Sequence, residues 1–382
     1  MIWPLRKART QDRASAESAS EPAAIPVFLL TGFLGAGKTT LLNRILADPR
    51  FADSAVVINE FGAVSVDHDL VRAGPAQVTV TSSGCLCCTV SSDLRGALFA
   101  LQEERAKGLG TAFARVIVET TGLADPAPVV AGLIPGTLPA FGLRDHVVAR
   151  RFRLARVIAA FDCEHGAGPL EHHFECWKQL AFADDIVLTK GDRAPAAPWK
   201  AEIAALNPSA RLHESMAPDF DLAALLEASS YDAATKPEDV AGWLALEALA
   251  QKAPSAAPLP GPSSAPITAA VAMAGPSASR HGGIATLSLI QDGPVDRTAF
   301  STFLQMLAAA PRGSGELLRV KGLVAYRDAP DRPEIIHMVQ HALCPARPLD
   351  GWPSDDRRSR LVVIGRDLRE EPLRKLFDVT RR

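Results

Sequence analysis

Short apolar runs alternate with helix-like segments over residues 25–215. The runs are rich in valine and isoleucine and lie at 27–30, 55–58, 78–81, 115–118, 155–160 and 186–188. Runs of this kind are typical of strands buried on both faces, and strands that alternate with helices build a parallel sheet. We therefore predict an α/β domain whose mostly parallel sheet is flanked by helices.

The pattern changes in the last third of the chain. Residues 253–279 are mostly Pro, Ala and Ser, a composition that buries little apolar surface and is typical of a linker. Beyond them, strands are expected at 283–289, 317–325, 335–339 and 361–364, with a helix at 297–310. The expected organisation is a disordered tail (1–24), a nucleotide-binding domain (25–252), the linker (253–279) and a smaller C-terminal α+β domain (280–382).

Composition narrows the class of protein. The chain has 382 residues, 47% of them hydrophobic, which suits two domains with large cores. Its 41 basic and 43 acidic residues give a net charge of -2, so no overall field favours nucleic acid or an anionic membrane. The first 24 residues lack the apolar stretch of a signal peptide, and no transmembrane run follows, so the expected location is the cytoplasm.

The strongest motif is G-F-L-G-A-G-K-T-T at 32–40. It follows a predicted strand and opens a helical pattern, which is the context that the Walker A rule requires. Backbone N–H groups of such a loop wrap phosphates, Lys38 is expected to reach the β- and γ-phosphates, and Thr39 to bind Mg²⁺. The predicted nucleotide-binding residues of this loop are Gly32, Gly35, Ala36, Gly37, Lys38, Thr39 and Thr40.

A second motif, T-K-G-D at 189–192, follows the last predicted strand of the sheet. It resembles the guanine-reading N-K-x-D motif of GTPases: Lys190 would lie along the purine, and Asp192 would accept hydrogen bonds that only guanine offers. Thr189 replaces the usual Asn and removes an amide that braces the loop. These residues favour GTP over ATP.

A third strand end, V-I-V-E-T-T-G at 116–122, occupies the place of a Walker B carboxylate. Glu119 is predicted to hold Mg²⁺ through water or to position the attacking water, and Gly122 to offer its N–H to the γ-phosphate. Together with Lys38, Glu119 is our candidate catalytic residue. The alternative is that Glu119 only caps the helix that begins near Asp125 and Pro126.

Three cysteines, Cys85, Cys87 and Cys88, are spaced too tightly for a disulfide framework. Thiolates favour Zn²⁺ and related metals, with Co²⁺ also accommodated, and three close ligands leave an open position that suits a carrier. Glu60 is the best additional ligand, followed by Asp67, His68 and Asp69. Two alternatives stay open, namely buried apolar cysteines and a redox pair of Cys85 with Cys88.

The other groups of metal-ligating residue types are less regular. We expect ordinary surface or packing roles for Cys163, Glu164, His165, His172, His173 and Cys176, and we assign no site to His281 or His337.

Taken in order, these motifs resemble the CobW family of metal-handling P-loop GTPases. The resemblance extends to N-E-F-G at 59–62, Q-L-A-F-A-D at 179–184, L-R-V-K-G at 318–322 and L-V-V-I-G-R at 361–366. It implies a GTPase that binds Zn²⁺ or Co²⁺ between nucleotide-sensitive loops and delivers it to a client metalloprotein or a cofactor-synthesis enzyme, which the C-terminal domain helps to select. The chain departs from the family at Thr189, at Ala63, where Glu is common, and in having no long His-rich tract.

Our leading hypothesis is a metallochaperone in which GTP and Mg²⁺ order the Glu60 loop and the cysteine loop, and hydrolysis loosens the metal site. A second hypothesis is a nucleotide-gated adaptor that docks on one metalloenzyme during its maturation. A third is a P-loop kinase acting on a small metabolite, which predicts no dependence on the three cysteines.

Overall fold

The structure is a computed structural model that describes residues 24–61, 77–83, 90–109, 112–134, 142–227, 284–309, 316–344, 346–353 and 355–381. The predicted linker and all of the predicted tail except Ala24 lie outside these residues. So do the three cysteines at 85–88 and the weaker candidates Asp67, His68, Asp69 and His281.

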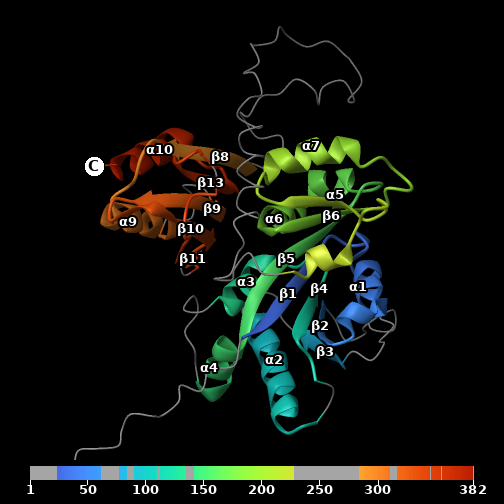
Figure 1. Ribbon diagram of the computed structural model, residues 1–382. Coiled ribbons are helices and arrows are strands. Elements are labelled where there is room, and N and C mark those ends of the chain that lie inside the picture. Colours follow the sequence, from blue (N-terminus) through green and yellow to red (C-terminus); the bar gives the residue numbers. More distant parts are fainter. Residues whose placement is uncertain are drawn as a thin grey trace, which may run out of the picture.

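The first domain is built on a seven-stranded sheet with the order β3-β2-β4-β1-β5-β6-β7, in which every neighbouring pair is parallel (Figure 1). Its strands are β1 (Ile25–Gly32), β2 (Ser54–Phe61), β3 (Gln77–Ser83), β4 (Arg115–Thr120), β5 (Phe152–Asp162), β6 (Asp185–Thr189) and β7 (Arg211–Glu214). The predicted α/β class is confirmed. The short β7 was not predicted, because its four half-buried residues carry no apolar run.

Helices cover both faces of this sheet. One face packs against α1 (Lys38–Ala47) and the short η3 (Leu222–Leu225) through a cluster that includes Leu42 and Ile158. The opposite face packs against residues of most of the other helices. These are α2 (Val90–Ala106), α3 (Pro126–Leu133), α4 (Gly142–Arg151), α5 (Ala167–His172), α6 (Phe174–Phe182) and α7 (Ala197–Leu206), and a short η1 (Pro49–Phe51) follows α1.

The C-terminal domain is an antiparallel sheet with the order β11-β10-β9-β13-β8, to which β12 adds at β10. Two helices pack on it through a separate core around Phe300 and Phe377. The elements are β8 (Ile284–Gln291), α9 (Arg297–Ala308), β9 (Glu316–Tyr326), β10 (Ala329–Val339), β11 (Ala342–Leu343), β12 (Arg347–Pro348), β13 (Ser359–Arg366) and α10 (Glu370–Val379). The predicted α+β class is confirmed, while α10 and the two-residue strands were not predicted.

The two domains share one apolar cluster. Leu318, Val339 and Ile364 of the second sheet belong to the same core as the α6 face of the first. A buried ion pair also joins the two domains. It is formed by Arg319 on β9 and Asp184, just before β6, and each side chain is only 1% exposed. The C-terminal domain is therefore packed against α6 and does not stand apart from it.

None of the helices among the described residues combines the length and apolar character needed to cross a membrane.

Candidate functional site

The candidate site lies at the carboxyl ends of the central strands. In a doubly wound parallel sheet, the loops after neighbouring strands diverge where the strand order reverses, and they leave a crevice at that edge. Here β1 lies between β4 and β5, so the loop after β1 is at the centre of this edge. The predicted phosphate loop is that loop.

Backbone geometry fits the phosphate loop to its task. Gly35 and Gly37 have φ angles of +73° and +88°, in the left-handed region that glycine adopts at little cost. Gly37 is the N-cap of α1 and carries no side chain to cover the first amides of the helix. The helix that begins at Lys38 therefore directs its positive end into the loop, as an anion site requires.

The two side chains predicted to handle phosphate and Mg²⁺, Lys38 and Thr39, lie at the start of α1, directly after this loop. The Lys38 ammonium donates a hydrogen bond to the carbonyl oxygen of Phe33 at 3.1 Å, which folds it over the loop. The Thr39 hydroxyl donates to Glu119 Oε1 at 2.8 Å. Residues 80 positions apart are thus brought together, and a hydroxyl beside a carboxylate is an oxygen donor set that suits Mg²⁺.

Glu119 does not cap the following helix. The N-cap of α3 is Asp125, whose carboxylate accepts a hydrogen bond from the Ala127 N–H at 2.9 Å. Glu119 lies inside β4, is 3% exposed and faces Thr39. The alternative interpretation of Glu119 is therefore excluded by the geometry.

Gly122 contacts the phosphate loop directly. A Cβ atom at this position would come within 2.5 Å of the Leu34 nitrogen and 2.7 Å of its Cα. These are backbone atoms and cannot rotate away, so only glycine lets the turn after β4 approach so closely. The turn at 121–125 lies against the loop that would hold the phosphates. We call it the sensor turn, after the γ-phosphate contact predicted for Gly122.

Thr189 does not weaken the loop in the way that its sequence predicts. Its hydroxyl lies 2.8 Å from the carbonyl oxygen of Ala36 and 3.0 Å from that of Phe161. A hydroxyl carries a single proton, so the two carbonyls share it. The brace that an Asn amide would make is replaced by a hydroxyl brace between the phosphate loop and β5.

Lys190 and Asp192, the predicted guanine-reading residues, lie in the turn directly after Thr189. Lys190 has a φ angle of +57°, an uncommon conformation for a residue other than glycine, and its ammonium lies 2.6 Å from Asp162 Oδ2. Asp192 is exposed. Sequence reasoning missed Asp162, although it lies two residues beyond a predicted strand and pairs in register with Thr189.

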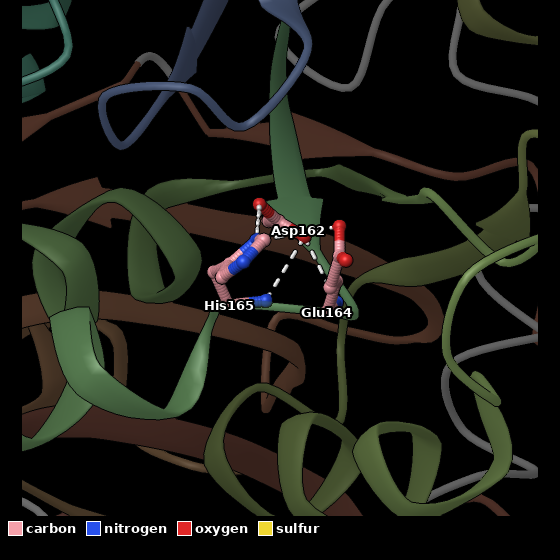
Figure 2. A group of neighbouring side chains, drawn as sticks. All are labelled: Asp162, Glu164 and His165. Atoms are coloured by element: carbon pink, nitrogen blue, oxygen red, sulfur yellow. Dashed lines mark hydrogen bonds and ion pairs between the residues drawn. The ribbon is translucent and has the colours of Figure 1, made fainter.

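Asp162 also belongs to a group of metal-ligating side chains with Glu164 and His165, whose ligand atoms lie within 4.8 Å of one another (Figure 2). Its Oδ1 accepts hydrogen bonds from the backbone N–H groups of both residues, at 2.8 and 3.1 Å. Burial tends to raise the pKa of Asp162, but hydrogen bonds from Lys190 and these amides outweigh it and lower the pKa. The group therefore holds a turn and the Lys190 ammonium, which accounts for it without a metal.

The neighbouring cysteines are packing residues. Cys163 and Cys176 are each 3% exposed, and desolvation raises their pKa values to about 11 and about 12. Thiols held protonated in this way are poor metal ligands. His173 stacks on Phe33 with ring centroids 4.8 Å apart, which is also a packing role.

The backbone places the predicted metal loops beside the nucleotide site. Glu60 in β2 pairs with Ser82 in β3, and Ile58 pairs with Glu119 in β4. Because neighbouring strands lie about 4.8 Å apart, the ends of β3 and β4 are separated by about 10 Å. The loop that carries the three cysteines thus begins at the same edge as Glu60 and Glu119, while the cysteines themselves lie outside the described residues.

Comparison with known proteins agrees with this geometry. The family model "CobW/HypB/UreG, nucleotide-binding domain" matches residues 26–214, and "Cobalamin synthesis protein cobW C-terminal domain" matches residues 284–381. The zinc chaperone YjiA of Escherichia coli is 30% identical over 354 residues, which cover 92% of this chain and 98% of that protein.

Two further relatives illustrate the range of the likeness. The zinc-regulated GTPase metalloprotein activator 1 of Schizosaccharomyces pombe is 30% identical over 175 residues, covering 44% of this chain and 39% of that protein. The crystal structure of Zn(II)-bound YjiA GTPase from E. coli has a TM-score of 0.63 and 25% identity, covering 94% of this chain and all of that one. The chain therefore belongs to the CobW family of P-loop nucleotide-binding proteins.

Proposed function

We propose that this protein is a GTP-hydrolysing metallochaperone that binds Zn²⁺, or Co²⁺, and passes it to a client metalloprotein or a cofactor-synthesis enzyme. The proposal rests most on one observation, the register that pairs Glu119 with Ile58 and so places Glu60, two residues further along β2, at the same sheet edge and beside the start of the cysteine loop. Relatives named as a zinc chaperone and as a zinc-regulated GTPase metalloprotein activator support it.

In this proposal GTP lies across the loop after β1. The phosphates occupy the positive end of α1, with Lys38 beside the β- and γ-phosphates. Thr189 holds the loop in place from the base side, Lys190 covers the purine, and Asp192 accepts hydrogen bonds from guanine. GTP is thus preferred to ATP through Lys190 and Asp192 in the turn after β6, which do not touch the phosphates.

Thr39 and Glu119 would hold Mg²⁺, either directly or through water. The ion, when bound, neutralises charge on the β- and γ-phosphate oxygens. Glu119 orients the attacking water by accepting its proton in a hydrogen bond, and its deep burial in β4 fixes that direction. The Gly122 N–H is directed to the γ-phosphate, so the sensor turn distinguishes GTP from GDP.

The cargo metal would be held by Cys85, Cys87, Cys88 and Glu60. Their loops start at the edge where the γ-phosphate is sensed, so loss of that phosphate changes the arrangement of the metal ligands. By thermodynamic linkage, the metal must then change the relative affinity for GTP and GDP by the same factor. The C-terminal domain would take part in choosing the client.

The test is GTP hydrolysis by the metal-free protein in Mg²⁺, with and without one equivalent of Zn²⁺ or Co²⁺. Metal is expected to change the rate, and replacement of all three loop cysteines by alanine is expected to abolish that response. Cys344→Ala is the matched control, because this thiol is buried in the C-terminal domain and desolvation raises its pKa to about 12. A rate indifferent to both metal and loop cysteines would overturn the metallochaperone and leave a nucleotidase, an adaptor or a small-molecule kinase.

A further inference from the structure

Helix α6 lies between the sensor turn and the C-terminal domain. Its residue Gln179 is 1% exposed, and the side-chain amide donates hydrogen bonds to the carbonyl oxygens of Gly122 at 3.0 Å and Ala124 at 3.1 Å. Both donor hydrogens of one amide are thus used on one turn. The sensor turn cannot move relative to α6 without breaking these bonds.

The preceding residue, Lys178, joins the same turn to the other domain. Its ammonium lies 3.0 Å from Asp125 Oδ2 and 2.7 Å from Glu316 Oε1, where Asp125 ends the sensor turn and Glu316 begins β9. The Lys178 side chain is 12% exposed, while the Asp125 and Glu316 side chains are 36% and 40% exposed, so water screens these two ion pairs in part. A single charge therefore bridges two carboxylates from different domains.

The far end of α6 is fixed to the same strand. The guanidinium of Arg319 donates hydrogen bonds to the carbonyl oxygens of Phe182 and Ala183 and pairs with Asp184. The Asn207 amide also bonds to Ala183 O, at 2.9 Å. The helix is thus held at its C-terminal end by β9 and contacts the sensor turn along its side.

These contacts give a structural role to the Q-L-A-F-A-D motif, which takes no part in the nucleotide site. In Q-L-A-F-A-D at 179–184, the first residue binds the sensor turn and the last binds β9. The segment between them is one helical turn with its end capped by the other domain. The segment from Gln179 to Asp184 therefore links the sensor turn to β9 over about one helical turn.

We infer that Gln179 is a positioning residue for the sensor turn, and that α6 with Lys178 couples this turn to β9 of the C-terminal domain. The inference rests on the proposed role of Gly122 in sensing the γ-phosphate. A ligand that shifts β9 shifts α6, and the turn follows because its carbonyls are bound to Gln179. By reciprocity, the nucleotide state also alters what the C-terminal domain presents to a client.

The sharpest test changes the two partners of the ion pair between the domains, Lys178 and Glu316. Glu316→Gln keeps the size of the side chain and removes the charge that Lys178 contacts, and Lys178→Met removes the bridging charge itself. Both are expected to change kcat for GTP hydrolysis about 3- to 10-fold while KM stays within about twofold. Lys178→Arg can keep both ion pairs and should restore the wild-type rate.

Asp328→Asn is the matched control. It breaks a surface ion pair with Arg297 inside the C-terminal domain, where the Asp328 side chain is 62% exposed. No change in kcat is expected. If Glu316→Gln and Lys178→Met hydrolyse GTP at the rate of Asp328→Asn, the coupling is wrong.

A second measurement does not depend on hydrolysis. Amide hydrogen exchange of the peptide that spans residues 120–127 should be about 3-fold faster or more in Glu316→Gln and Lys178→Met than in the wild-type chain, without nucleotide. Unchanged exchange would overturn the inference whatever the activity. Faster exchange in a protein that fails to hydrolyse GTP would leave the connection standing and reject the proposed function instead.

Discussion

The Thr189 hydroxyl lies 2.8 Å from the Ala36 carbonyl oxygen, so one side chain at the end of β6 holds the loop at the end of β1. A Cβ atom on the neighbouring Gly37 would lie 3.5 Å from the Thr189 methyl carbon, which is ordinary contact. The position that distinguishes this chain from the usual guanine-reading motif therefore braces the phosphate loop.

Removal of the hydroxyl should weaken binding of every nucleotide. Thr189→Val keeps the shape of the side chain and removes the hydroxyl that both carbonyls accept from, and it is expected to lower GTP and ATP affinity together by about 3- to 10-fold. Thr189→Ser should bind as wild type. Titration calorimetry with both nucleotides checks this, with Thr302→Val on α9 as the control, since that hydroxyl only bonds to Thr298 O within its own helix. A loss confined to GTP would contradict the brace.

The preference for guanine over adenine should depend on Asp192. Asp192→Ala removes two charge-assisted hydrogen bonds to guanine, so GTP affinity should fall about 100-fold and ATP affinity little. Competition between the two nucleotides for a fluorescent GDP analogue measures the ratio. Asp378→Ala changes the same charge on the exposed face of α10 and should leave the ratio intact. A ratio unaffected by Asp192→Ala would mean that another group reads the base.

Substitution of Glu119 should slow GTP hydrolysis without weakening nucleotide binding. Glu119→Gln keeps a hydrogen-bond acceptor for the Thr39 hydroxyl but removes the charge, and kcat is expected to fall about 100-fold or more while GDP affinity changes little. Thr39→Val should instead raise the Mg²⁺ concentration needed for half-maximal hydrolysis by about 10-fold or more. Single-turnover assays across a Mg²⁺ series distinguish the two effects. Equal loss of GDP affinity and kcat in Glu119→Gln would assign it a binding role only.

The buried ion pair between the domains predicts a pH dependence of stability. Burial alone would raise the pKa of Asp184, but Arg319, Lys321 and His337 outweigh it and lower the pKa well below its usual range. A carboxyl with a depressed folded-state pKa contributes stability above its unfolded value of about 3.8, and this is lost as pH falls through the folded value. Asp184→Asn should lower the free energy of unfolding by about 3–5 kcal/mol at pH 7.

The difference between wild type and Asp184→Asn should narrow below about pH 3.8, where the Asp184 carboxyl takes up a proton in the unfolded chain while it stays ionised in the folded one. Urea unfolding at a series of pH values provides the measurement. Asp331→Asn is a surface comparison, since that carboxylate pairs with Arg357 while both side chains are largely exposed, and the substitution should cost about 1 kcal/mol or less. A difference that stays constant from pH 7 to pH 3 would contradict this account.

Much of the nucleotide site could be predicted from the sequence because each of its motifs is a short continuous segment. The phosphate loop, Glu119 and the T-K-G-D motif each lie at the end of an apolar strand, and parallel strands bring such ends together without further information. The fold class follows from the same alternation. Even the position of Glu60 beside the start of the cysteine loop follows once β2 and β3 are neighbours.

The connections between distant residues could not be predicted in this way. Asp162 binds Lys190 across two strands, and Arg319 binds Asp184 across 135 positions. The sequence shows no periodic pattern that indicates which charged residues pair, and each of these side chains could pair with many others of opposite charge. Thr189 illustrates a different limit, because its residue type indicates a lost amide, while only the three-dimensional arrangement shows the hydroxyl in its place.

The ion pair between Arg319 and Asp184 also limits how this chain can change over generations. A recombinant that joined the first domain to the second domain of a relative would have to inherit a cation at the position of Arg319, or else leave a carboxylate buried without its counter-charge. The two halves are therefore not interchangeable, and a second domain taken from a relative fits this one when it brings a cation for Asp184 or when residue 184 changes with it.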